Sequence, residues 1–138
     1  MTASSDDITS LELDYHKHPQ SDAFVPLVEA YLRNKRYMEA MVVCKKVIKN
    51  VGSDPRGRLM LARVYLDQGK PPKAEQELHA LLAVFPDHVD AMILQAGLYK
   101  TTGRKSEAIQ QYQRILAVQP GRQDIKDALK VLGVDVEP

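Results

Sequence analysis

The chain has 138 residues, a formal charge of +1 and one cysteine, and its length suits one compact domain rather than two ordinary ones. The near-neutral charge excludes a surface that attracts nucleic acid throughout, and the single cysteine, Cys44, excludes an internal disulfide. Because the polar opening "MTASSDDITS" is unlike a signal peptide and no apolar run is long enough to span a membrane, we expect a cytoplasmic protein that binds no nucleic acid and does not insert into membranes.

Residues 1–20 are predicted to form an N-terminal capping helix, equivalent to half of a helical pair. In "DDITSLELDYHKHP", Asp6 or Asp7 is a candidate helix cap, and Pro19 is expected to end the helix. The apolar stripe of this helix consists of Ile8, Leu11 and Tyr15. We expect the stripe to cover one end of the units that follow.

Three similar helix–turn–helix strings come next, at residues 21–54, 55–88 and 89–122. They contain "FVPLVEAYLRNKRYMEAMVVC", "RLMLARVYLDQGKPPKAEQEL" and "MILQAGLYKTTGRKSEAIQQY". Equivalent residues recur every 34 positions: Tyr31, Tyr65 and Tyr99; Ala40, Ala74 and Ala108; Gly69 and Gly103; Pro86 and Pro120. A period near 34 with two helices in each unit is typical of a stacked helical repeat. One helix pair cannot bury its apolar face alone, so the units must stack.

Residues 123–134 are predicted to form a C-terminal capping helix, and 135–138 a tail or linker. The apolar face of the helix consists of Ile125, Ala128, Leu129 and Leu132. Gly133 is expected to end it. The predicted fold class is therefore all-α, an α-solenoid of seven or eight helices with at most trivial strand content.

The repeated units resemble tetratricopeptide repeats (TPRs) from about Ser21 to Arg122. The middle unit carries the family signature at Leu61, Ala62, Tyr65, Gly69, Ala74, Leu78 and Pro86, and the third at Ala96, Tyr99, Gly103, Ala108, Tyr112 and Pro120. The departures are Cys44 at an aromatic position, Lys35 and Gly52 in place of the usual Gly and Pro, Arg58 in place of a large apolar residue, and Gln95 in place of Leu. The resemblance implies a right-handed α-solenoid, or α-α superhelix, that serves as a scaffold or adaptor for protein binding.

The sequence offers no constellation of catalytic or metal-binding residues. It contains no Gly-rich phosphate loop, serine elbow, cysteine pair or His-Glu-x-x-His helix. His16 and His18 are two residues apart, so on a helix they point to nearly opposite sides, and they can share an ion only if the segment is extended. Cys44 occupies a core-facing repeat position, where a thiol is inert. We predict no enzyme activity, no cofactor and no metal.

Function is then expected on the free face of the first helix of each unit, which lines the inner surface of such a stack. The predicted partner-binding residues are Val25, Pro26, Glu29, Leu32, Arg33, Arg56, Leu59, Met60, Arg63, Leu66, Ile93, Leu94, Gly97 and Lys100. Two rows of this set, Val25, Leu59, Ile93 and Pro26, Met60, Leu94, are apolar throughout. The scaffold does not require apolar residues there, so the rows predict an apolar or amphipathic protein segment as partner.

Three alternatives stay open. The best-known peptide-binding TPR class holds a C-terminal carboxylate with a clamp of two Lys, an Asn and an Arg, but Val25 and Glu29 stand where that clamp expects Lys and Asn. Residues of the apolar rows can instead pack as core between the inner helices. The same surface can also serve self-association in a homo-oligomer, or a secretion or assembly chaperone-like domain of a longer protein.

Overall fold

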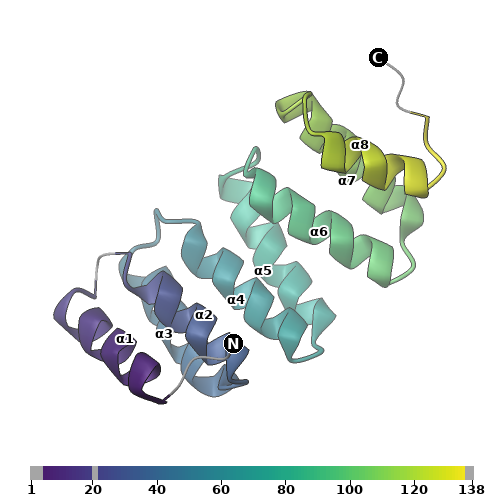
Figure 1. Ribbon diagram of the computed structural model, residues 1–138. Coiled ribbons are helices and arrows are strands. Elements are labelled where there is room, and N and C mark those ends of the chain that lie inside the picture. Colours follow the sequence, from purple (N-terminus) through teal and green to yellow (C-terminus); the bar gives the residue numbers. More distant parts are fainter. Residues whose placement is uncertain (1–4, 20–21, 136–138) are drawn as a thin grey trace. The chain divides into compact units, whose positions relative to one another are not determined.

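The computed structural model describes residues 5–19 and 22–135. These residues form eight helices and no strand (Figure 1): α1 (Ser5–Lys17), α2 (Phe24–Arg33), α3 (Tyr37–Asn50), α4 (Arg56–Asp67), α5 (Pro71–Val84), α6 (Val89–Thr101), α7 (Lys105–Val118) and α8 (Gln123–Val131). The predicted all-helical fold class is confirmed. The helices are interrupted where Gly, Pro and short polar runs punctuate the sequence.

The chain divides into two compact units, residues 1–77 and 78–138, and the division falls within α5. In the first unit α1 packs on α2, α3 packs on both α2 and α4, and α2 also contacts α4. In the second unit α6 packs on α7, and α7 packs on α8. The repeat limits at 54/55 and 88/89 remain a proposal from the sequence.

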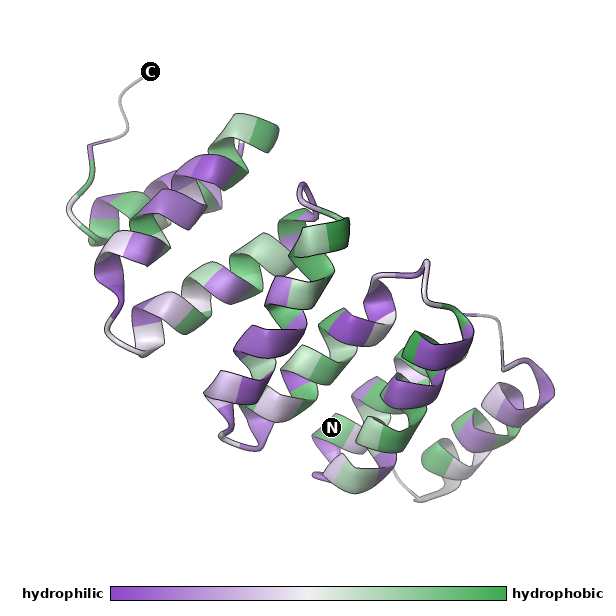
Figure 2. Cartoon of the chain, turned by 180° about the vertical axis from the view of Figure 1, so that it is seen from behind, coloured by the Kyte–Doolittle hydropathy of each residue, from purple (hydrophilic) through white to green (hydrophobic). Residues whose placement is uncertain are grey.

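Small residues at the repeated positions allow close packing within each helix pair. Ala40, Ala74 and Ala108 are fully buried. A residue without a long side chain lets two helix axes approach closely, and larger neighbours fill the space beside it. Figure 2 shows hydrophobic and hydrophilic residues alternating along the helices of each unit, as expected when one side of every helix packs and the other meets solvent.

The turns inside the repeats share one backbone conformation. Gly69 (φ 74°) and Gly103 (φ 78°) are left-handed, which confirms the prediction that they end their helices. Lys35 adopts the same conformation, with φ 58°, although it is not a glycine. In each turn the next residue donates its backbone N–H to the carbonyl oxygen of the repeated tyrosine; for Arg36 and Tyr31 the distance is 2.8 Å. This bond closes the last turn of the first helix in all three repeats.

The two terminal helices present the predicted apolar faces. Ile125 and Leu129 of α8 are buried, and Gly133 is left-handed with φ 86° just after the helix. Ile8 and Tyr15 of α1 are buried. The prediction that Asp6 or Asp7 caps α1 is wrong, because the helix already begins at Ser5 and places both in its first turn. Acidic residues are favourable throughout a first turn, so they do not mark its first residue uniquely.

Three departures from the repeat pattern are accommodated by specific contacts. Arg58 donates to the Glu77 carboxylate at 2.9 Å and so ties α4 to α5 within the first unit. Gln95 and Gln111 are both buried and hydrogen-bond each other at 2.7 Å between α6 and α7. Cys44 is fully buried in α3. Polar substitutions at core positions are thus paired, as burial of polar groups requires.

Candidate protein-interaction surfaces

The first helices of the first unit, α2 and α4, carry ten of the predicted partner-binding residues. Their exposure differs. Exposed are Pro26, Arg33 and Arg63; half-buried are Val25, Glu29, Arg56, Leu59 and Leu66; buried are Leu32 and Met60. Eight of the ten therefore keep surface that a partner can reach.

Met60 and Leu32 belong to the core, so the packing alternative applies to them. Their exposed fractions are 3% and 9%. The contact between α2 and α4 removes side chains on that side of the two helices from solvent. A charge placed at Met60 would therefore disturb the fold before it disturbed any interface, and Leu59 is the better position at which to alter this surface.

The charged residues of this surface fall into two groups. Arg56 pairs with Asp54 at 2.8 Å and with Asp22 at 2.6 Å, and its guanidinium lies over the Phe24 ring. The hydrogen bond from Arg56 lowers the pKa of the Asp54 carboxyl. Arg56 thus connects the start of α4 to the segment before α2, and its charge is already balanced.

Arg63, by contrast, remains available at the surface of α4. Its guanidinium lies 3.9 Å from the Glu29 carboxylate, and both side chains are more than two-fifths exposed. Arg63 also contacts the Met60 sulfur at 3.7 Å, so its stem lies along the buried residue. An exposed ion pair of this kind contributes little to stability and can exchange its partner.

In the second unit, four predicted residues lie on α6. Ile93 packs against the core formed by α6, α7 and α8 and, like Leu94, remains half-buried. Lys100 is exposed. A Cβ built on Gly97 would meet nothing within 4 Å, so the space beside this glycine is open. The second unit therefore presents apolar surface and a cation on one helix.

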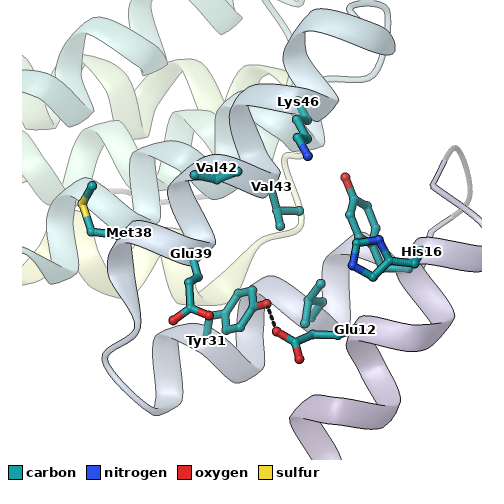
Figure 3. Close-up of a pocket in the computed structure, with 10 residues that line it drawn as sticks. Glu12, His16, Tyr31, Met38, Glu39, Val42, Val43 and Lys46 are labelled. Carbon is teal, nitrogen blue, oxygen red and sulfur yellow. Dashed lines mark hydrogen bonds between the residues drawn. The ribbon is translucent and has the colours of Figure 1, made fainter.

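The structure also contains a groove that the sequence analysis did not identify. It lies between α1 and α3, has a volume of about 290 Å³ and is lined by Glu12, Tyr15, His16, Leu27, Tyr31, Met38, Glu39, Val42, Val43 and Lys46 (Figure 3). We call it the α1–α3 groove. Met38 and Val42, one helical turn apart, are exposed by 69% and 52%. Their spacing on the face of α3 opposite Ala40 and Cys44 was the sequence signal for it.

The acidic end of the α1–α3 groove is held together internally. Figure 3 shows the Tyr31 hydroxyl donating to the Glu12 carboxylate. Arg36 pairs with Glu39 and lies 3.9 Å from Glu12. Burial, followed by the contact with Glu12, raises the pKa of Tyr31, and the hydrogen bond from Arg36 lowers the pKa of Glu39. Both carboxylates are thereby kept ionised and oriented.

A second hollow occupies the equivalent place in the second unit. It has a volume of about 310 Å³ and is lined by His79, Leu82, Pro86, Met92, Gln95, Tyr99, Gln111 and Arg114. Four of its positions lie two repeat periods after lining residues of the α1–α3 groove: Leu27 and Gln95, Tyr31 and Tyr99, Val43 and Gln111, Lys46 and Arg114. Leu and Val in the first hollow are replaced by two glutamines in the second, so the second hollow is polar.

The described residues contain no group of three or more His, Cys, Asp and Glu side chains that could hold a metal ion. His88 uses its Nδ1 to accept the Ala91 N–H and so caps α6. Burial raises the pKa of the Cys44 thiol to about 12, which makes its thiolate inaccessible at neutral pH. None of the described helices is long and apolar enough to cross a membrane.

A chain of antiparallel helix pairs with a 34-residue period, left-handed turns and free inner-helix faces is a helical-repeat protein. The Tetratricopeptide repeat family model matches residues 59–128, just over half of the chain, and the chain belongs to this family. It is 28% identical over 92 residues to the Tetratricopeptide repeat protein 21 homolog of Caenorhabditis briggsae and 32% identical over 99 residues to Anaphase-promoting complex subunit 7 of Mus musculus. These matches cover 67% and 71% of this chain but only 7% and 18% of the two relatives.

Solved structures show the same fold. A thermophilic TPR protein of Thermus thermophilus superposes with a TM-score of 0.83 at 23% identity, covering 93% of this chain and 72% of that one. The first TPR of Spaghetti (RPAP3), bound to the HSP90 peptide SRMEEVD, superposes with a TM-score of 0.68 at 18% identity, covering 95% of this chain and 96% of that one. The fold is therefore that of TPR proteins, which supports a role as a protein-interaction scaffold.

Proposed function

We propose that the protein is a non-catalytic, cytoplasmic adaptor that binds an apolar or amphipathic segment of a partner protein through the free faces of its first helices. The observation that carries the proposal is the juxtaposition of half-buried apolar side chains with a rim of accessible charge. In the first unit these are Val25 and Leu59 beside Glu29 and Arg63. The scaffold gains nothing from leaving such residues at its surface, whereas a partner segment can cover them.

The second unit supports the same function on α6. Ile93 and Leu94 supply apolar surface, and open space beside Gly97 suits a bulky anchor side chain. Lys100 and, in the first unit, Arg63 would favour acidic residues that flank the apolar segment. A free carboxylate tail, like that of the HSP90 peptide in the RPAP3 structure, is not the proposed ligand, because Val25 and Glu29 replace the Lys and Asn expected for a carboxylate clamp.

Self-association is the second candidate, since another copy of the chain could cover the same apolar residues. Solution mass separates the two. A partner-binding adaptor stays monomeric at micromolar concentration, whereas a self-association module changes mass with concentration and loses that change in Leu59→Asp.

The proposal is tested by affinity capture from the native lysate with two baits, the parent chain and Leu59→Asp. Leu59 is half-buried, so the variant keeps enough of its surroundings for the fold to be checked by circular dichroism. We expect a protein that the parent retains and the folded variant loses, because an unpaired carboxylate under a partner is strongly unfavourable. Retention of the same proteins by both baits would contradict binding through this surface.

A further inference from the structure

The α1–α3 groove is a second apolar surface, separate from the free faces of α2 and α4. Its walls come from α1 and α3, and its floor includes Leu27 and Val43, which are buried in the first unit. Met38 and Val42 stand exposed at its edge, and so does Leu13 of α1, which is 56% exposed. An exposed apolar strip around a hollow of this size exceeds what single scattered surface residues produce.

The charges of the groove are divided between its two ends. Glu12 and Glu39 lie at the end near Tyr31, whereas His16 and Lys46 lie at the other end, beyond Val43 (Figure 3). The acidic end is already neutralised by Arg36. At the basic end, the exposed lysines Lys45, Lys46 and Lys49 form no ion pair within the described residues. The unbalanced charge of the groove is therefore positive and lies at one end.

The groove also continues past its first hollow. A second, smaller hollow of about 80 Å³ is lined by Tyr15, Pro19, Lys46, Val47, Asn50 and Val51, and it shares Tyr15 and Lys46 with the first. From Met38 to Asn50 along α3 is about 18 Å of helix. A helical segment of about three turns has that length, and its apolar stripe would cover Met38 and Val42 while its far end reached the lysines.

We propose that the α1–α3 groove docks an amphipathic helix of a partner protein whose apolar stripe is followed by acidic residues, and that these residues face Lys46 and its neighbouring lysines. This surface is distinct from the one in the proposed function, and either can exist without the other. A ligand with basic residues at that end is disfavoured by like charge. The equivalent hollow of the second unit does not take such a helix, because Gln95 and Gln111 make it polar.

The test uses two helix-stabilised peptides of about 14 residues that differ only at one end. Both carry leucines at helical spacing, one followed by glutamates and the other by lysines. Binding to the full chain is measured by fluorescence anisotropy at low and high salt. We expect the acidic peptide to bind at least about tenfold more tightly than the basic one at low salt, with the difference shrinking as salt rises.

Val42→Glu, Lys46→Glu and the control Val84→Glu locate the site. Val84 is exposed by 69% and lies on α5, away from the lining residues. Val42→Glu should weaken the acidic peptide at least about tenfold, and Lys46→Glu should weaken it while strengthening the basic peptide. Val84→Glu and the inner-face variant Arg63→Glu should leave binding unchanged, so failure of this site and failure of the proposed function remain distinguishable.

Three results would overturn the proposal. The first is equal affinity of the two peptides, or no binding of either. The second is an equal effect of Val42→Glu and Val84→Glu while circular dichroism shows both variants folded. The third is a concentration-dependent doubling of mass that Val42→Glu abolishes, which would assign the groove to a second copy of this chain.

Discussion

Gln95 of α6 and Gln111 of α7 hydrogen-bond to each other inside the second unit, with Nε2 of Gln111 donating to Oε1 of Gln95 at 2.7 Å. Both side chains are buried. The equivalent residues of the first repeat, Leu27 and Val43, are apolar and also buried. The same pair of positions in one fold is therefore filled by hydrophobic packing in one repeat and by a paired amide in another.

This pairing predicts strongly non-additive mutations. Gln111→Val alone leaves the Gln95 amide buried without its partner, and we expect a loss of about 1–3 kcal/mol in the free energy of unfolding. The double variant Gln95→Leu/Gln111→Val restores the combination found in the first repeat and should recover most of that loss. Urea unfolding of the two single variants and the double variant measures it. Additive losses would show that the amides do not act as a pair.

The turn glycines predict opposite effects of the same substitution. Gly103→Ala forces a Cβ into the left-handed region and should destabilise by about 1 kcal/mol. Gly97→Ala lies inside α6, where the added Cβ meets nothing, and should stabilise by about 0.5–1 kcal/mol. Thermal unfolding of both variants checks the signs. Similar shifts in one direction would contradict the assigned backbone conformations.

The ion pair between Asp54 and Arg56 predicts a pH-dependent contribution to stability. Because the hydrogen bond from Arg56 lowers the pKa of Asp54 below 3.8, the unfolded chain binds more protons than the folded one in that window. The stabilisation is thus fully present above pH 3.8 and is lost as the pH falls through the folded-state pKa. Asp54→Asn should cost up to about 1 kcal/mol at neutral pH, since the pair is partly exposed.

The Asp54→Asn variant is compared with the parent by chemical unfolding between neutral and strongly acidic pH. The difference in unfolding free energy should shrink towards acid, because the parent then loses the charge that the variant lacks at every pH. A difference that stays constant across the range would show that the carboxylate charge does not stabilise the start of α4.

The repeat core of the first unit predicts large losses from two further substitutions. Leu61 is 2% exposed and Ala74 is fully buried. Leu61→Ala should cost about 2–5 kcal/mol through the cavity it leaves. Ala74→Asp should be at least as damaging, because it places an unpaired charge between close helices. Thermal unfolding followed by circular dichroism measures both, with exposed Val84→Ala as control. Parental stability in both core variants would reverse the assignment of buried and free faces.

Local chemistry made most of the helix pattern predictable from the sequence. Gly69 and Gly103 mark turns because only glycine adopts their backbone conformation without strain, and the 34-residue recurrence of Tyr31 and Tyr65 aligns the units. Lys35 shows the limit of this argument, since it occupies the same conformation without the expected residue type.

The free surfaces were less predictable, because contacts between helices decide them. Met60 stands in an apolar row that the repeat leaves free, yet it is buried in the first unit. The α1–α3 groove depends on how α1 packs on α2, and the spacing of Ile8 and Tyr15 fixes which face of α1 is buried but not how far the helix lies from α3. Exposure therefore followed from packing that no single helix encodes.

The central claim is that a partner protein covers the apolar residues on the free faces of α2 and α4. The most direct measurement is calorimetric titration of a partner captured by the parent chain against the parent, Leu59→Asp and the exposed control Val131→Asp, all shown by circular dichroism to be folded. We predict that Leu59→Asp weakens binding at least about tenfold and that Val131→Asp binds like the parent. Equal affinities for all three proteins would contradict the claim.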